Sequence, residues 1–163
     1  GVQEESDLAL VDAVAARDRY VGSLELFDPE TLCLAVLTQA DPSSVGFSGV
    51  GGLIEEVTSV DDDAFFIRFE SPTDSNWIIR GPTAPGHYAD LGLLEAKKIK
   101  IGEEVKVDGP VLLAFDGERK RRLVEGAQAI IQVKRDGPWL IDVAKVMKWA
   151  TRNGTYLSVK NRN

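Results

Sequence analysis

Cysteine and histidine are almost absent from this chain, which contains one of each, Cys33 and His87. A single cysteine cannot form a disulfide within the chain, so we expect a reducing, cytoplasmic setting. One cysteine and one histidine are also too few for a structural zinc site, and we predict no metal ligands. A nucleophilic Cys–His pair would require the two side chains to meet in space.

Long apolar runs and an excess of basic residues are also missing. No stretch approaches the ~18 residues of a membrane span, and nothing near the first residues is typical of a signal peptide, so we expect no membrane contact. Lysine and arginine number 19 against 26 acidic residues, a net charge of -7 that disfavours nucleic acid as a partner. A small phosphorylated ligand stays open, because local donors can outweigh the overall field within a Debye length of about 8 Å.

The 163 residues, of which 44% are hydrophobic and 28% charged, have the composition of one globular domain. The spacing of apolar residues near the N-terminus predicts one helix over Leu8–Val21. Asp28-Pro29-Glu30 is typical of a helix start, and predicts a second helix that ends at Asp41. Cys33 would lie inside this second helix as a small buried hydrophobe. We therefore predict a helical lead-in segment over residues 1–41.

From residue 42 to 163 the pattern changes to short runs separated by turn residues, which is typical of antiparallel strands. The candidate strands are Val45–Ser48, Leu53–Val60, Ala64–Glu70, Asn76–Arg80, Leu91–Glu95, Lys98–Ile101, Glu104–Val107, Val111–Phe115, Arg121–Val124, Gln128–Lys134 and Trp139–Ile141. Strands and helices do not alternate, which excludes a doubly wound parallel sheet. Apolar residues after Asp142 predict a short helix that ends at Gly154. The predicted fold is mainly β: an antiparallel β-sandwich with N-terminal helices and one C-terminal helix.

Three stretches could carry chemistry, and the first is the serine- and glycine-rich segment Ser43–Gly52. Glycines let a ligand approach the backbone closely and hydroxyls supply adaptable donors, so this composition suits a nucleotide or a sugar. The alternative is a bulged strand whose glycines lie at close packing points. On this segment alone, the packing interpretation is favoured.

The second stretch is Gly81–Tyr88, which contains two prolines and two glycines within six residues. This composition predicts a rigid, shaped loop, and ordered loops on a β scaffold often carry function. His87 and Tyr88 could hydrogen-bond to a ligand or stack on it. The alternative is a solvent-exposed loop histidine with no ligand.

The third stretch is Phe115-Asp116-Gly117-Glu118-Arg119. An Asp-Gly pair between apolar runs predicts a hairpin turn. A carboxylate at such a tip, here Glu118, could act as a general base, with the neighbouring basic residues lowering its pKa. Taken alone, the segment is more typical of a charged surface hairpin.

In their order and spacing, these three stretches resemble the C-terminal domain of the ATP–NAD kinase family, and most closely its acetoin-catabolism branch. That family has a Ser/Thr-rich segment ending in Gly-Gly, then a proline loop, then an Asp-Gly-Gln or Asp-Gly-Glu turn. The resemblance covers residues 17–154. It implies nucleotide contacts at Ser43, Ser44, Gly46, Ser48, Gly51, Gly52, Pro85, Gly86 and His87. It also implies that Asp116 and Glu118 face the acceptor hydroxyl.

The resemblance further implies a two-domain parent protein in which ATP and Mg²⁺ belong to an N-terminal α/β domain and NAD is the substrate. A β-sandwich like this one shapes the NAD site, and the last helix returns to the N-terminal domain. The Gly-Gly-Asp-Gly motif of the catalytic domain occurs nowhere in the chain. We therefore expect the isolated chain to be inactive, and we expect its apolar helix faces to form a homo-oligomer.

Two other functions remain open at this point. The first is a non-catalytic ligand-binding, regulatory or oligomerisation module that has the same fold. The second is a lipid-kinase-like acceptor domain, because Glu118 stands where NAD kinases usually have glutamine.

Overall fold

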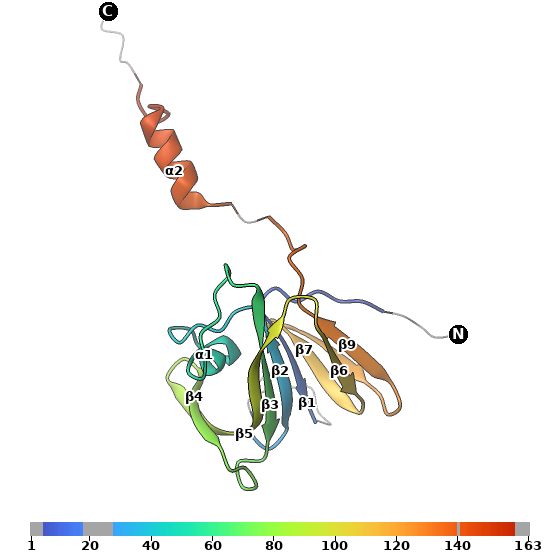
Figure 1. The fold of residues 1–163 in the computed structure, drawn as a ribbon. Helices are drawn as coiled ribbons and strands as arrows, with labels where there is room; N and C mark the ends of the chain where they lie inside the picture. Colours follow the sequence, from blue (N-terminus) through green and yellow to red (C-terminus); the bar gives the residue numbers. More distant parts are fainter. Residues whose placement is uncertain (1–4, 18–27, 140, 159–163) are drawn as a thin grey trace, which may run out of the picture.

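The computed structural model describes residues 5–17, 28–139 and 141–158. The regular structure of this part consists mainly of antiparallel strands, together with two helices (Figure 1). The elements are β1 (Asp12–Ala16), β2 (Leu32–Leu37), α1 (Phe47–Gly52), β3 (Asp63–Glu70), β4 (Ile78–Ala84), β5 (His87–Lys100), β6 (Glu104–Asp108), β7 (Val111–Phe115), β8 (Arg119–Leu123), β9 (Gln128–Gln132) and α2 (Val143–Arg152). Seven strands form one sheet in the order β4-β5-β3-β2-β1-β7-β8, and β6 pairs with β9 in a separate ribbon.

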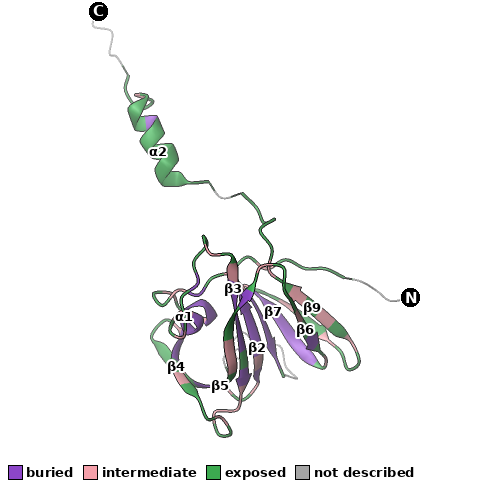
Figure 2. Cartoon of the chain, viewed as in Figure 1, coloured by how far each residue is buried: buried purple, intermediate pink, exposed green. Residues whose placement is uncertain are grey.

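The seven-stranded sheet is buried on both faces over its centre, where Figure 2 shows the strands in purple. On one face, Leu37, Phe65 and Ile67 pack beneath α1, which contributes Phe47 and Val50. The opposite face packs against the β6–β9 ribbon through a second cluster of apolar side chains. Its members include Val36, Phe66 and Leu113 from the sheet, and Val107 and Ile131 from the ribbon. The sheet and the ribbon thus form a partial sandwich.

The ribbon reaches that face because one long hairpin folds back on itself. β6 continues into β7, and β8 continues into β9. The half of the hairpin next to its turn, β7–β8, joins the sheet beside β1, and the other half, β6–β9, forms the ribbon. The hairpin bends at Gly109, between β6 and β7, where the Gly109 N–H donates to the carbonyl of Ala127 at 2.9 Å. A Cβ on Gly109 would lie within 3.0 Å of the backbone of Val124. The close approach of the two backbones therefore requires glycine there.

The helices predicted in the first 41 residues are wrong wherever the structure describes them. Asp12–Ala16 and Leu32–Leu37 are strands β1 and β2, and they pair with each other at the centre of the sheet. The remainder of the first predicted helix, residues 18–21, lies outside the described residues. A short run of apolar residues fits a strand buried on both faces as well as a helix stripe. Pairing with β3 and β7 satisfies the backbone of both segments, and long-range contacts decide the outcome.

Most of the predicted strands after residue 60 are confirmed, and Val111–Phe115 is β7 with the predicted bounds. The two predicted strands at Leu91–Glu95 and Lys98–Ile101 belong to one long strand, β5. Three predictions are wrong, and the first two are Val45–Ser48, which runs into helix α1, and Leu53–Val60, in which only Val57 forms a β-bridge. Neither Trp139 nor Ile141 belongs to a strand, and residue 140 lies outside the described part.

The C-terminal helix is confirmed as α2, which Asp142 caps by accepting the N–H of Lys145 at 2.8 Å. It stands apart from the sheet at the end of an extended segment, and Figure 2 shows almost all of it exposed. Ala150 is the buried residue of α2. No helix in the described part is long and apolar enough to span a membrane.

Candidate functional site

The serine- and glycine-rich segment and the proline segment meet at one edge of the sheet. The N–H of Gly46 donates to the carbonyl of Pro82 at 2.7 Å, which ties the loop before α1 to edge strand β4. Behind this contact Val50 of α1, which is fully buried, packs directly on the backbone at Gly81. Two of the three stretches singled out in the sequence therefore form one surface.

The serine hydroxyls of this segment donate hydrogen bonds within the fold. The Ser43 hydroxyl donates to Asp41 Oδ1 at 2.7 Å, and the Ser44 hydroxyl donates to Asp41 Oδ2 at 3.1 Å. The Ser43 N–H and hydroxyl hold the pKa of Asp41 below its ordinary value, so Asp41 stays an acceptor for both. The Ser48 hydroxyl donates to the carbonyl of Gln39 at 3.1 Å and is buried. Ser43 is exposed and Ser44 is half-buried, whereas Ser48 serves packing.

Most glycines of the segment are explained by packing. A Cβ on Gly49 would lie within 3.0 Å of the backbone of Ser44, and one on Gly51 would lie 2.6 Å from Leu37 Cδ1. A Cβ on Gly52 would likewise lie within 3.0 Å of the backbone of Asp41 and Pro42. The packing interpretation of this stretch therefore holds for these three positions, although the element is a helical turn and not a bulged strand. Gly46 differs, because it has a φ of 86° and open space on its Cα.

The proline segment forms the β4–β5 hairpin, with Pro85 and Gly86 at its exposed turn. Thr83 is buried, and its Oγ1 lies 2.8 Å from Nδ1 of His87. This contact fixes the direction of an imidazole that is otherwise exposed, and Tyr88 beside it is also exposed. Hydroxyl oxygens, an oriented imidazole and a phenol ring are groups that can hydrogen-bond to a ligand or stack on it.

The predicted juxtaposition of Glu118 with these loops is wrong. Asp116 and Glu118 lie in the turn between β7 and β8, and β8 is the sheet edge opposite to β4. The reason is the order of pairing, which places three strands, β3, β2 and β1, between the β4–β5 hairpin and the β7–β8 hairpin. Glu118 is exposed. Asp116 has the left-handed φ of 53°, and its carboxylate accepts the N–H groups of Leu10 and Val11 at 2.9 and 2.7 Å.

Asp116 and its neighbour Asp12 have perturbed acidities. Burial acts to raise the pKa of Asp116, but the N–H donors of Leu10, Val11 and Asp12 outweigh it and hold the pKa below its ordinary value. Burial, followed by the charge of Asp116, raises the pKa of Asp12 to about 6. No local pattern in the sequence marks Asp12 as the neighbour of Asp116, which lies 104 positions away.

Cys33 and His87 do not form a nucleophilic pair. The Cys33 thiol donates to the carbonyl of Thr31 at 3.6 Å, and burial raises its pKa, which opposes thiolate formation. His87 instead contacts Thr83 on the outer hairpin. In the part of the chain that the structure describes, no three His, Cys, Asp or Glu side chains cluster as metal ligands.

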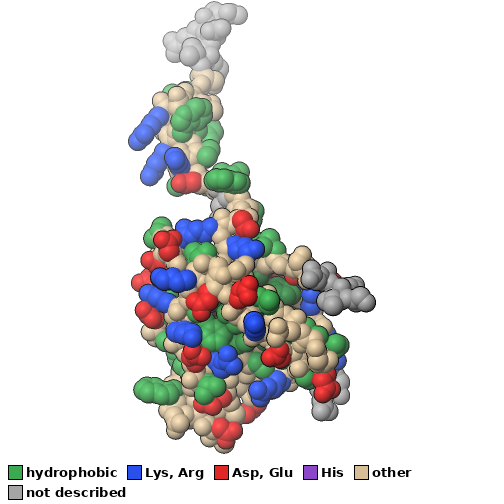
Figure 3. Space-filling model, turned by 45° about the vertical axis from the view of Figure 1, so that its right-hand side comes forward, with side chains coloured by type: hydrophobic (Ala, Val, Ile, Leu, Met, Phe, Trp, Pro, Cys, Tyr) green, Lys and Arg blue, Asp and Glu red, His purple; other side chains and the backbone are tan. Residues whose placement is uncertain are grey.

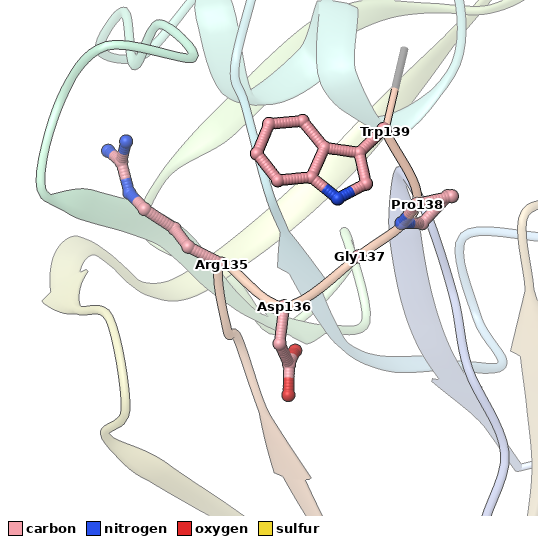
Figure 4. A pocket seen from close by; sticks show the side chains of 5 residues that line it. All are labelled: Arg135, Asp136, Gly137, Pro138 and Trp139. Carbon is pink, nitrogen blue, oxygen red and sulfur yellow. The ribbon is translucent and has the colours of Figure 1, made fainter.

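Two open surface hollows lie along the C-terminal segment, one of them at Lys145, Val146 and Trp149 of α2. The other is formed by five consecutive residues, Arg135 to Trp139, and Figure 4 shows the indole lying above the backbone while Arg135 and Asp136 point away in other directions. Trp139 is fully exposed. Side chains that diverge from one stretch of chain do not form a built binding pocket.

These features define a small antiparallel β domain whose loop surface lies at one sheet edge and whose C-terminal helix leaves an apolar face open. The chain belongs to the family of acetoin catabolism protein X C-terminal domains, whose sequence profile matches residues 2–136. It is 27% identical over 148 residues to acetoin catabolism protein X of Cupriavidus necator, which is 90% of this chain and 41% of that protein. No solved structure matches significantly. The acetoin-catabolism part of the resemblance is thus confirmed, while the relationship to ATP–NAD kinases stays a prediction.

Proposed function

We propose that the chain is the ligand-binding module of a larger kinase-like protein of acetoin catabolism, with NAD or a related nucleotide as its ligand. The observation that carries this proposal is the single surface formed by Ser43–Gly46 and Pro82–His87, tied together by the Gly46–Pro82 hydrogen bond. The chain spans about two fifths of the curated relative that it matches, which supports a larger parent. The order of motifs that resembles the ATP–NAD kinases supports the choice of nucleotide.

The proposed contacts are the accessible groups of that surface. They are Ser43, Ser44, Gly46, Pro85, Gly86 and His87. At Gly46 and Gly86 no side chain stands between the backbone and a ligand. The oriented His87 ring can hydrogen-bond to a ribose hydroxyl, and Tyr88 can stack on a base. Buried Ser48 and the packing glycines Gly51 and Gly52 would instead hold the loop in place.

ATP, Mg²⁺ and the transfer step would belong to the N-terminal α/β domain of the parent. Phosphoryl transfer needs a phosphate cradle and metal-binding carboxylates. The described residues contain no cluster of three candidate metal ligands, and the full sequence has no Gly-Gly-Asp-Gly motif. This chain would bind and orient the acceptor, and the catalytic carboxylate would come from outside it.

A second candidate function, an interaction module, is favoured by the open face of α2. Val143, Val146, Met147 and Trp149 are each 47–66% exposed, and Figure 3 shows hydrophobic and basic side chains gathered on this helix. An uncovered apolar face of this kind marks an interface. We propose that it docks on the N-terminal domain of the parent, as the resemblance implies. A second copy of the chain, giving a homo-oligomer, is the alternative occupant.

The test of ligand binding is calorimetric titration of NAD into the parent protein and its His87→Ala variant. We expect His87→Ala to weaken binding about tenfold, the effect of one lost hydrogen bond of ~1.4 kcal/mol. Lys106→Ala is the matched control, because Lys106 is exposed on the ribbon strand β6, away from the loop surface. Absence of NAD binding to a folded parent would overturn the nucleotide proposal and leave the interaction module.

A further inference from the structure

The segment that leads into β1 is fastened to the basic strand β8 by ion pairs. Arg121 Nε lies 2.8 Å from Asp7 Oδ2, and Arg119 donates to the other oxygen of the same carboxylate. Arg121 also pairs with Glu5, and Arg119 donates to the carbonyl of Leu8. One carboxylate is therefore bridged by two guanidinium groups that come from alternate positions of a single strand.

The two arginines are held in place by the hairpin that carries them. Strand β8 pairs with β7, and alternation along the strand brings Arg119 and Arg121 to the same side. The Arg119 guanidinium lies 5.9 Å from the centre of the Phe115 ring and 3.6 Å from Asp116. A cation over an aromatic face is attracted to it, so the first guanidinium is already oriented. The pair is thus a formed receptor for an anion with two or more oxygens.

The carboxylate on this receptor is attached in a way that allows exchange. Only about half of the Arg119 and Arg121 side chains is exposed, at 49% and 46%. The Asp7 side chain is 16% exposed, but its carboxylate is held by ion pairs to these two half-exposed arginines, and such ion pairs are screened by salt. Leu10 and Val11, in contrast, are fixed through their backbone N–H groups to Asp116. Glu5–Leu8 can therefore leave β8 while the start of β1 stays in place.

We propose that Arg119 and Arg121 form an anion site for a phosphoryl group, and that Asp7 occupies it as a built-in competitor. A phosphoryl oxygen pair takes the place of the Asp7 carboxylate, and segment Glu5–Leu8 detaches when it does. Guanidinium forks bind phosphate and carboxylate with the same geometry, and removal of Glu5 and Asp7 leaves two guanidiniums beside one carboxylate, that of Asp116. The site lies at the sheet edge opposite to the proposed nucleotide surface and does not rest on it.

Pyrophosphate is a suitable probe. Its binding is monitored by hydrogen exchange of residues 5–8 and by the amide NMR shifts of strand β8. We expect millimolar pyrophosphate to speed exchange of this segment beyond sodium chloride at the same ionic strength. In Asp7→Asn the competitor is weakened, so pyrophosphate should bind about five- to tenfold more tightly. In Arg121→Gln the pyrophosphate response should be lost.

Arg80→Gln is the matched control, because Arg80 also pairs with an acid, Asp90 at 3.8 Å, but on the edge strand β4. Its response to pyrophosphate should equal that of the unmodified chain. The proposal is overturned if sodium chloride reproduces the whole response, or if Arg121→Gln and Arg80→Gln respond alike. It is also overturned if Asp7→Asn binds pyrophosphate no more tightly than the unmodified chain does.

Discussion

Substitution of Gly81 by alanine tests the packing that brings the two loop segments together. The new Cβ would lie 2.6 Å from Val50 Cγ2, well inside an ordinary van der Waals contact of 3.4–4 Å. Val50 cannot move away easily, because α1 is closely packed on either side of it: a Cβ on Gly49 would lie within 3.0 Å of the backbone of Ser44, and one on Gly51 would lie 2.6 Å from Leu37 Cδ1. Overpacking of this kind costs about 1–3 kcal/mol, so Gly81→Ala should lower the free energy of unfolding by about 2 kcal/mol.

A double-mutant cycle with Val50→Ala isolates the contact between residue 81 and Val50. Val50→Ala alone should cost about 2 kcal/mol through lost burial and a small cavity. It also removes the methyl group that the new Cβ meets, so the double variant should be more stable than additivity requires by about 1–2 kcal/mol. Urea unfolding followed by circular dichroism measures all four proteins. Strictly additive effects would refute the proposed contact between α1 and β4.

Gly137→Ala is the control for the general effect of replacing glycine by alanine. A Cβ on Gly137 meets no atom within 4 Å, and its φ is not left-handed. We expect its free energy of unfolding to change by less than about 0.5 kcal/mol. A loss as large as that of Gly81→Ala would show that backbone flexibility, and not the clash with Val50, dominates.

Three further predictions follow from the acidic residues and from α2. Because the folded-state pKa of Asp12 is about 6 against 3.8 in the unfolded chain, its ionisation removes stability as pH rises through this window. Asp12→Asn should therefore raise the free energy of unfolding at pH 7 by about 1–2 kcal/mol, after allowance for solvent screening. In urea titrations, this added stability should vanish below about pH 4. Glu118→Gln should change any NAD phosphorylation rate of the parent by less than about twofold, because Glu118 is exposed at the sheet edge opposite to β4. A rate lowered by about 100-fold or more would show that Glu118 belongs to the acceptor site. Removal of residues 140–163 should leave the urea midpoint of the isolated chain unchanged, since α2 is exposed apart from Ala150; a lower midpoint would show that α2 packs on the sheet in solution.

Local patterns in the sequence predicted single turns of the candidate site but not how its segments come together. The turn at Asp116-Gly117 was predicted, because Asp and Gly impose local backbone angles. Gly81–Tyr88 was predicted as a rigid loop, whereas the structure has strand residues on both sides of a short turn at Pro85 and Gly86. The meeting of Ser43–Gly46 with Pro82 depends on how α1 packs against β4, which no local pattern records. Glu118 lies at the other edge of the sheet because of the strand order, which is a property of the whole sheet. The role of Asp7 is likewise a contact over 112 residues of sequence.

The sequence by itself determined the features that depend on neighbours along the chain. These are the predominance of antiparallel strands after residue 60, the bounds of β7, and helix α2 with its Asp142 cap. Tertiary structure alone decided that Asp12–Ala16 and Leu32–Leu37 are strands. Both segments are short and apolar, so helix and strand bury them equally well in isolation. Only the sheet supplies hydrogen-bond partners on both sides of each segment, and that supply of partners selects the strand.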